Sequence, residues 1–154
     1  MKQTLIAFTV AACCAFAGTA GAAGAAVTKE EYKAQMDKIE ADYKAANDIC
    51  KTLKANAQDI CKAEAKGKEK IAKAELDAKA NPTPANQVKV QEAKADAAYD
   101  VAKERCDDRK GNEKDACQKQ AKADHERAKA DIKRADSKAT GTSAGTGSTK
   151  ATTK

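Results

Sequence analysis

The sequence is short of the residues on which most enzymes and nucleic-acid-binding proteins depend. Its 154 residues include one histidine and no tryptophan, and aromatic residues make up only 3% of the chain. His125 stands between Asp124 and Glu126 without a nucleophile and partner beside it, so we interpret it as a surface residue rather than a general base. No aromatic residues interleave the basic ones, so nucleic acid is not an expected partner.

Other catalytic and ligand-binding patterns are missing as well. The glycines near the C-terminus, Gly141, Gly145 and Gly147, neither follow a strand nor open a helix, as a phosphate-binding loop requires. Acidic residues are scattered among lysines, which is typical of ion pairs along a helix rather than of paired catalytic carboxylates. A zinc site is disfavoured because the cysteines are not closely spaced pairs. We therefore predict no enzyme activity, no cofactor and no metal.

The N-terminus has the composition of a cleavable signal peptide over residues 1–22. Lys2 supplies a positive charge, residues 5–17 form an apolar run, and residues 20–22 read Ala-Gly-Ala, a cleavage motif. The run is short for a membrane span, so we expect no transmembrane span after signal removal. Export would bring the protein to an oxidising compartment, and we expect this compartment to be the bacterial periplasm. Acylation of Cys13, as in a lipoprotein, is the alternative.

The most informative pattern is an internal repeat with an offset of 56 residues. Residues 43–67 resemble residues 99–123, and both copies keep ten residues between two cysteines. The matched pairs are Tyr43 and Tyr99, Cys50 and Cys106, Asn56 and Asn112, Asp59 and Asp115, and Cys61 and Cys117. Helix-ending and helix-starting residues lie between the cysteines, so each copy is predicted to form an antiparallel helical hairpin.

The turn of each hairpin is predicted to lie midway between its cysteines. In the second copy a helix should end near Lys110, where Gly111 can adopt the left-handed conformation and Asn112 can cap the next helix. Ala55-Asn56 is a weaker form of the same signal in the first copy. Each cysteine would then lie about one and a half helical turns from the bend, at matching heights on two facing helices.

This spacing favours structural disulfides between Cys50 and Cys61 and between Cys106 and Cys117. Four cysteines allow three connectivities, so pairing across the two copies stays open, as do unbridged thiols buried between the helices. A thiol-redox role is least favoured, because that chemistry is typical of a CxxC motif rather than of cysteines ten residues apart.

The fold class predicted from these patterns is all-α, with two tandem antiparallel helical hairpins that either close into a four-helix bundle or extend as two units. The predicted division is hairpin repeat 1 at 28–80, a proline-containing linker at 81–84, hairpin repeat 2 at 85–137, and a disordered basic tail rich in Gly, Ser, Thr and Lys at 138–154. The four helices are expected at about 29–53, 57–80, 84–110 and 113–136.

The first hairpin has the richer apolar seam. Thr28 and Glu31 form a capping box, and the residues that follow recur with the alternating four- and three-residue spacing of a coiled coil: Tyr32, Met36, Ile39, Tyr43, Ala46, Cys50 and Leu53. Between 84 and 110 only a thin stripe remains: Val88, Ala95, Tyr99, Ala102 and Cys106. Alanine buries little surface, so we expect the second hairpin to depend more on its disulfide.

The doubled Cys-x10-Cys, with Asn and Asp in the turn between, resembles small Ala/Lys-rich exported proteins of proteobacteria whose function is uncharacterised. These are often labelled TolA-like cell-envelope proteins. The resemblance covers about Tyr32 to Asp136. It implies a location in the envelope and a non-catalytic role, with no active-site residues to carry over.

The predicted function is therefore a disulfide-stabilised helical structural or protein-interaction module of the periplasm. Its expected partners are an envelope protein or further copies of itself, bound through the helices. The alternative is a binding module for anionic envelope polymers or lipid surfaces, since the net charge is +6 and Lys138, Lys150 and Lys154 lie in the predicted tail. Lysines and acids alternate along the helices, however, which indicates solvated faces rather than a polyanion site.

Overall fold

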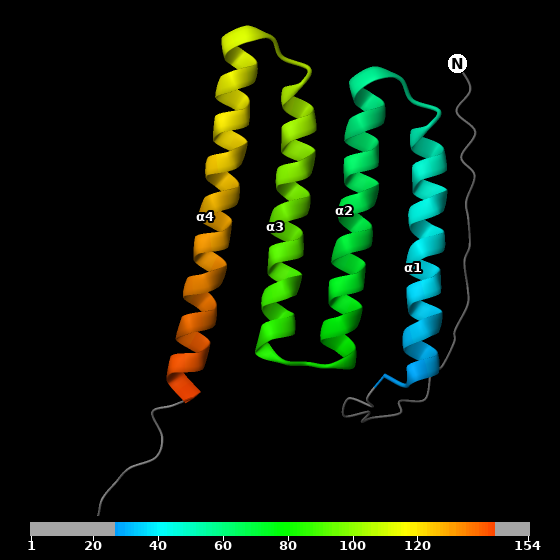
Figure 1. The fold of residues 1–154 in the computed structure, drawn as a ribbon, viewed down its shortest axis with the longest axis vertical. Coiled ribbons are helices and arrows are strands. Elements are labelled where there is room, and N and C mark those ends of the chain that lie inside the picture. Colours follow the sequence, from blue (N-terminus) through cyan, green and yellow to red (C-terminus); the bar gives the residue numbers. More distant parts are fainter. Residues whose placement is uncertain (1–26, 144–154) are drawn as a thin grey trace, which may run out of the picture.

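The computed structural model describes residues 27–143 and consists there of four α-helices and their connections (Figure 1). The helices are α1 (Lys29–Cys50), α2 (Ala55–Ala80), α3 (Pro84–Cys106) and α4 (Gly111–Ser143). No strand occurs in this range. Successive helices run antiparallel, which confirms the all-α prediction of two tandem hairpins.

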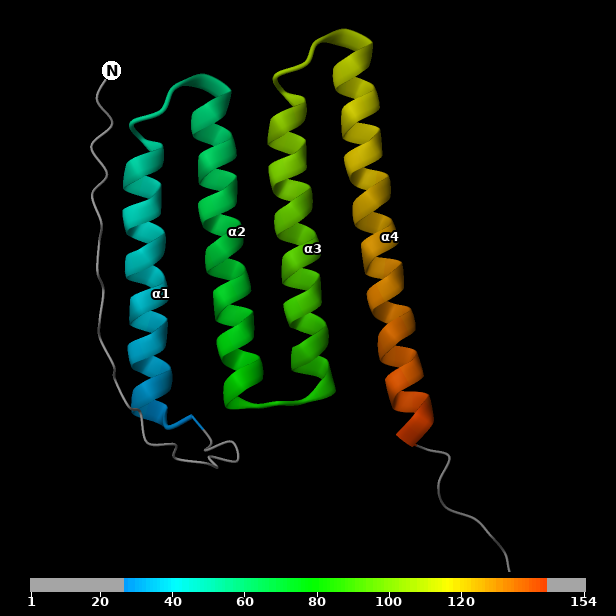
Figure 2. The same ribbon diagram turned by 180° about the vertical axis from the view of Figure 1, so that it is seen from behind.

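The four helices lie side by side in a single layer, in the order of the chain (Figures 1 and 2). Among the described residues each helix contacts only its neighbours in sequence: α1 contacts α2, α2 contacts α3, and α3 contacts α4. The most extensive of these contacts is the one between α2 and α3, which joins the two hairpins. The hairpins therefore pack together without closing into a four-helix bundle, and the layer keeps two open faces and two outer edges.

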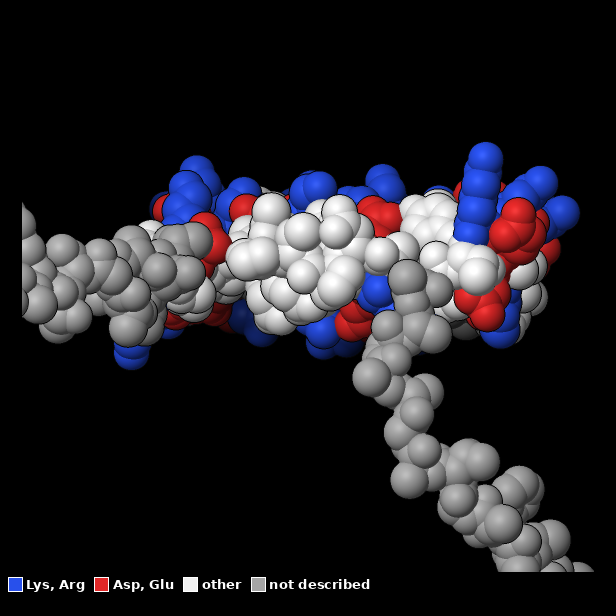
Figure 3. All heavy atoms as spheres, turned by 90° about the horizontal axis from the view of Figure 1, so that it is seen from below, with Lys and Arg blue, Asp and Glu red and all other residues white. Residues whose placement is uncertain are grey.

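Charged side chains cover both faces of this layer. Seen along the helices in Figure 3, the molecule is a slab with Lys, Arg, Asp and Glu along both of its long sides and uncharged residues between them. The buried residues are few and mostly small, because each helix is covered only where it meets a neighbour. They are Cys50, Ala65, Gly67, Leu76, Ala78, Val90, Ala97, Cys106 and Ala121. A layer one helix thick has no central core, so its stability depends on close contacts at three seams.

The predicted helix starts at α1 and α3 are confirmed by their caps. The Thr28 hydroxyl accepts a hydrogen bond from the Glu31 backbone N–H at 3.1 Å, and the Glu31 carboxylate accepts one from the Thr28 backbone N–H at 3.0 Å. At α3 the Thr83 hydroxyl accepts from the backbone N–H of Asn86 at 3.2 Å, with Pro84 in the first turn. Both arrangements satisfy N–H groups that a helix leaves without intrahelical partners.

The predicted ends of α1 and α3 are wrong. Both helices end at their cysteine, rather than near Leu53 and Lys110, because the chain then tightens into turns with three-residue spacing. The backbone N–H of Leu53 donates to the Cys50 carbonyl at 3.1 Å, and that of Arg109 donates to the Cys106 carbonyl at 3.0 Å. Leu53 therefore lies outside the coiled-coil seam and is 40% exposed.

The residue that opens the second helix of each hairpin has a left-handed backbone. Gly111 and Ala55 both have a φ of 51°, so the conformation predicted for Gly111 is confirmed, although it begins α4 rather than ending α3. Asn112 lies inside α4 and does not precede it as a cap. The Asn56 side chain instead donates to the Glu104 carbonyl of α3 at 2.8 Å, which ties the first turn to the neighbouring hairpin.

Helix α4 continues beyond the predicted boundary at residue 137 and ends at Ser143. The tail predicted at 138–154 is therefore helical in its first part, since Lys138 and Ala139 are good helix formers and no proline interrupts them. Residues 144–154 lie outside the described residues. The same holds for the predicted signal peptide at 1–22 and for Cys13.

Candidate functional site

The candidate site residues are the four cysteines, and the structure joins them as two disulfides. Cys50 is bonded to Cys61 with 5.4 Å between their Cα atoms, and Cys106 to Cys117 with 5.6 Å. Both bridges link adjacent helices within one hairpin, which confirms the favoured pairing. The predicted symmetry about the turn is wrong, because Cys50 and Cys106 end their helices while their partners lie further inside α2 and α4.

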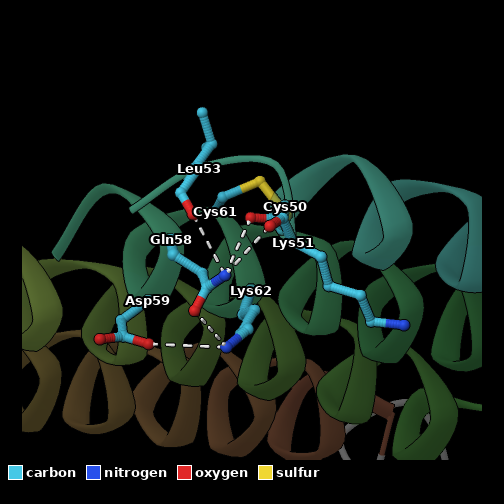
Figure 4. Close-up of polar contacts among 7 residues, drawn as sticks. All are labelled: Cys50, Lys51, Leu53, Gln58, Asp59, Cys61 and Lys62. Carbon is cyan, nitrogen blue, oxygen red and sulfur yellow. Dashed lines mark hydrogen bonds and ion pairs between the residues drawn. A yellow bond between two sulfur atoms is a disulfide. The ribbon is translucent and has the colours of Figure 1, made fainter. Parts of the chain in front are cut away.

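The first bridge lies against a turn that a single glutamine organises (Figure 4). The Gln58 side-chain amide lies 3.4, 3.5 and 3.2 Å from the carbonyl oxygens of Cys50, Lys51 and Leu53, respectively. Carbonyls at the C-terminus of a helix have no intrahelical partner, and this amide supplies one from the next helix. The Lys62 ammonium in turn donates to the Gln58 side-chain oxygen at 3.0 Å.

The second turn uses an ion pair where the first uses this amide. Lys114, which corresponds to Gln58 in the repeat, places its Nζ 3.0 Å from Oδ1 of Asp107. The Gln118 amide donates to the same carboxylate oxygen at 3.4 Å. Both turns are thus tied to the helix that follows them, by different side chains at equivalent positions.

The surroundings of the disulfides favour a structural role over exchange chemistry. Cys50 and Cys106 are 0% exposed, and Cys61 and Cys117 are half-buried. Thiol–disulfide exchange requires a thiolate to reach one of the two sulfurs, and the burial of Cys50 and Cys106 leaves only the sides of Cys61 and Cys117 open to that approach.

His125 is not the surface residue that its charged neighbours suggest. Its ring stacks on Tyr99, with 4.7 Å between the ring centroids and 15° between the planes. Its Nε2 lies 2.6 Å from Oδ1 of Asp96, and its side chain is only 17% exposed. The His125 side chain therefore links α4 to α3. Its partners lie on another helix, and Asp96 is 29 residues away in the sequence, so the residues around His125 do not indicate them.

Hairpin 1 has a different network at the equivalent level. Glu69 corresponds to His125 and Glu40 to Asp96, and two carboxylates cannot bond to each other directly when ionised. Lys73 bridges them, with its Nζ 2.8 Å from Glu69 and 3.3 Å from Glu40. The pKa of Lys73 is raised, mainly by its side-chain hydrogen bond with Glu69. The repeat thus preserves a link between helices at this level while its chemistry differs.

A tyrosine closes the open end of hairpin 1. The Tyr32 hydroxyl donates to Oδ1 of Asp77 at 2.5 Å, which connects the first turns of α1 to the last turns of α2. This hydrogen bond raises the pKa of Tyr32, because the carboxylate stabilises the protonated phenol. Tyr32 was predicted on the apolar seam, but its polar partner Asp77 is 45 residues away in the sequence and was not predicted.

Within residues 27–143, no group of His, Cys, Asp and Glu side chains is arranged to hold a metal ion. None of the described helices combines the length and apolarity needed to cross a membrane. Comparison with known proteins found no matching family model, no similar curated protein and no matching solved structure.

Proposed function

We propose that this protein is a non-enzymatic component of the bacterial periplasm that acts as a disulfide-stabilised helical structural or protein-interaction module of the cell envelope. The observation that carries the proposal is the open layer. Every described helix has exposed surface on both faces, and the outer edges of α1 and α4 are covered by no other described element. A layer of this kind offers a large helical surface relative to its mass, and the two disulfides keep that surface in shape. Disulfides of this kind persist in oxidising compartments, which supports the periplasmic location.

The distribution of charge favours a protein partner over an anionic polymer. Acidic and basic side chains alternate on both faces in Figure 3, and many form ion pairs with each other. A polyanion-binding surface requires an excess of one sign, whereas mixed charges suit a partner whose own charges complement them.

Cross-linking in intact periplasm tests this function. We expect a photo-reactive residue placed on a layer face, for example at exposed Lys68, to yield discrete protein adducts identifiable by mass spectrometry. The matched control carries the same label with all four bridging cysteines replaced by serine, and should lose those adducts as the layer loosens. Recovery of no protein adduct from any labelled face or edge position would contradict the proposal.

A further inference from the structure

The seam between α2 and α3 is an interface between two copies of one repeat. Gly67 packs directly on Ala97 there. The polar contacts across the seam are the Asn56 amide to the Glu104 carbonyl at 2.8 Å, Glu64 to Arg105 at 3.0 Å, Lys70 to Asp100 at 3.5 Å, and Glu75 to Lys94 at 2.8 Å. These contacts show how the second helix of one repeat unit binds the first helix of the next.

The outer edges of the layer are the unused counterparts of this seam. With the 56-residue offset, the outer edge of α4 corresponds to the edge of α2 that binds α3, and the outer edge of α1 corresponds to the edge of α3 that binds α2. In the described part of the chain neither edge has a neighbour. The α4 edge of the layer therefore carries the α2-like surface of the internal seam, and the α1 edge carries the α3-like surface that would bind it.

The charges on the two edges are complementary in the register that the repeat defines. The internal pair Lys70–Asp100 corresponds to Glu126 of one copy opposite Lys44 of the next, with both charges reversed in sign. The internal pair Glu75–Lys94 corresponds to Asp131 opposite Lys38, with the signs kept. Both replacements join opposite charges. Pairing α1 with α1 would instead bring lysine-bearing edges together, so charge favours unlike edges.

An apolar residue supports the same register. Ile49 is 65% exposed near the C-terminus of α1, at the position that corresponds to Arg105, which contacts α2 within the chain. Its counterpart across the edge is Gln120, at the position of Glu64. An uncharged pair thus replaces an ion pair, and association would cover an isoleucine that the single chain leaves in water.

We propose that copies of this chain associate head to tail, with the outer edge of α4 on the outer edge of α1 of the next copy, so that the single layer continues from copy to copy. This inference rests on the proposed structural function and names a second copy of the chain as the partner. Such a contact joins two different surfaces, so it does not close on itself and generates open chains of subunits.

The contact between copies is weaker than the internal seam. Ala123 and Ala41 take the places of Gly67 and Ala97, so two methyl groups meet where the internal seam has one, and Arg127 takes the place of Ile71. Lys38 and Asp131 also have partners within their own helices, Asp42 at 2.7 Å and Arg134 at 3.2 Å, in exposed pairs that contribute little. Association is therefore expected to be reversible, concentration-dependent and weakened by salt.

Sedimentation of the oxidised protein over a wide concentration range tests the proposal. Wild-type protein should form dimers and larger species as concentration rises. Ala41→Arg blocks the α1 edge and Ala123→Arg blocks the α4 edge, so each variant alone should be monomeric. In an equimolar mixture the intact α4 edge of the first variant can bind the intact α1 edge of the second, so a 1:1 dimer and nothing larger should form. Ala98→Arg is the matched control, because an exposed residue of the internal helix α3 points to a face of the layer, and it should behave as wild type.

Charge reversal provides a second test, which does not depend on the steric bulk of an introduced side chain. Lys44→Glu or Glu126→Lys should each weaken association about fivefold, because opposite charges become like charges. The double variant Lys44→Glu/Glu126→Lys should recover the wild-type affinity, since the reversed pair attracts again.

Two outcomes would overturn the proposal: a wild-type monomer at every concentration, or edge variants that assemble as wild type does. If protein adducts still form in periplasm in either case, self-assembly fails while the interaction function stands. If neither assembly nor adducts are found, both fail.

Discussion

Gly67 of α2 faces Ala97 of α3 so closely that a Cβ atom added at Gly67 would lie 2.8 Å from the Cβ of Ala97. Both residues are buried at the seam between the hairpins. Glycine disfavours helix, and its presence inside α2 is explained by this approach of two backbones. The contact sets how the two halves of the layer join.

Gly67→Ala tests this approach. An unhindered glycine-to-alanine change in a helix would stabilise by about 1 kcal/mol, but here the added methyl must push the helices apart, and we expect a net loss of about 1 kcal/mol. Adding Ala97→Gly restores the room, so the double variant should be more stable than the sum of the single effects predicts. Urea unfolding measures all three, with Ala98→Gly as the control for helix propensity. A more stable Gly67→Ala variant would exclude the close approach.

Ala55 and Gly111 provide a matched pair for backbone strain. Both have a φ of 51°, but alanine has a Cβ that the left-handed conformation disfavours. We expect Ala55→Gly to stabilise the protein by about 0.5–1 kcal/mol and Gly111→Ala to destabilise it by a similar amount. No atom lies within 4 Å of a Cβ built at Gly111, so the loss would reflect conformation rather than a clash. Thermal unfolding checks both, and shifts of the same sign would contradict the argument.

The two disulfides should differ in importance. Replacing Cys106 and Cys117 by serine should cost more than replacing Cys50 and Cys61, because α1 and α2 share larger apolar side chains than α3 and α4 do. Closing a loop of this length contributes about 2–3 kcal/mol. Circular dichroism gives the helicity and midpoint of each double variant, and hydrogen exchange locates the loosened helix, which should be α4 for the second pair. Unchanged exchange in α4 would show that this bridge is dispensable.

Stability should fall in acid through the α1 cap. Hydrogen bonding by Thr28, first from its backbone N–H and then from its side chain, holds the pKa of Glu31 below its ordinary value of 4.5. A carboxyl with a lowered folded-state pKa contributes stability above its unfolded pKa and loses it as pH falls through the folded one. The stability difference between wild type and Glu31→Gln should therefore be constant above pH 4.5 and shrink below it.

Urea midpoints measured between neutral and strongly acidic pH give that difference. Glu30→Gln is the control, since it removes a neighbouring first-turn charge while leaving the capping box intact. A difference that does not change with pH would show that the Glu31 carboxylate makes no cap in solution.

The sequence allowed the hairpins to be predicted because their signals are local. Thr28 and Thr83 start helices through hydrogen bonds to residues three positions further on. The cysteine spacing, which is the same in both copies, indicates which cysteines are paired. The exact turns could not be predicted, since Gln58 and Lys114 stabilise them from the following helix. Their partners could be assigned only once the end of the preceding helix was known.

The single layer was less predictable for a physical reason. Helix α2 has two seams: Leu76 lies with Ile39 of α1 in one groove, while Gly67 packs on α3. A helix with two contact faces does not show a single apolar stripe in its sequence. Alanine is small enough to pack on either face, so its positions do not distinguish the two. Gly67 was the available signal, since an isolated glycine within a helical pattern often marks a close contact.

The placement of the disulfides also determines how the protein would respond to tension. Both bridges lie at the end of the layer that carries the α1–α2 and α3–α4 turns, whereas α1 begins and α4 ends at the opposite end (Figure 1). A pull on those termini would peel the outer helices away from their neighbours, starting far from the bridges and stopping at Cys50 and Cys117. The ten residues enclosed by each bridge, about 35 Å when extended, would never be drawn out. The two bridges thus set how much of each hairpin tension can draw out.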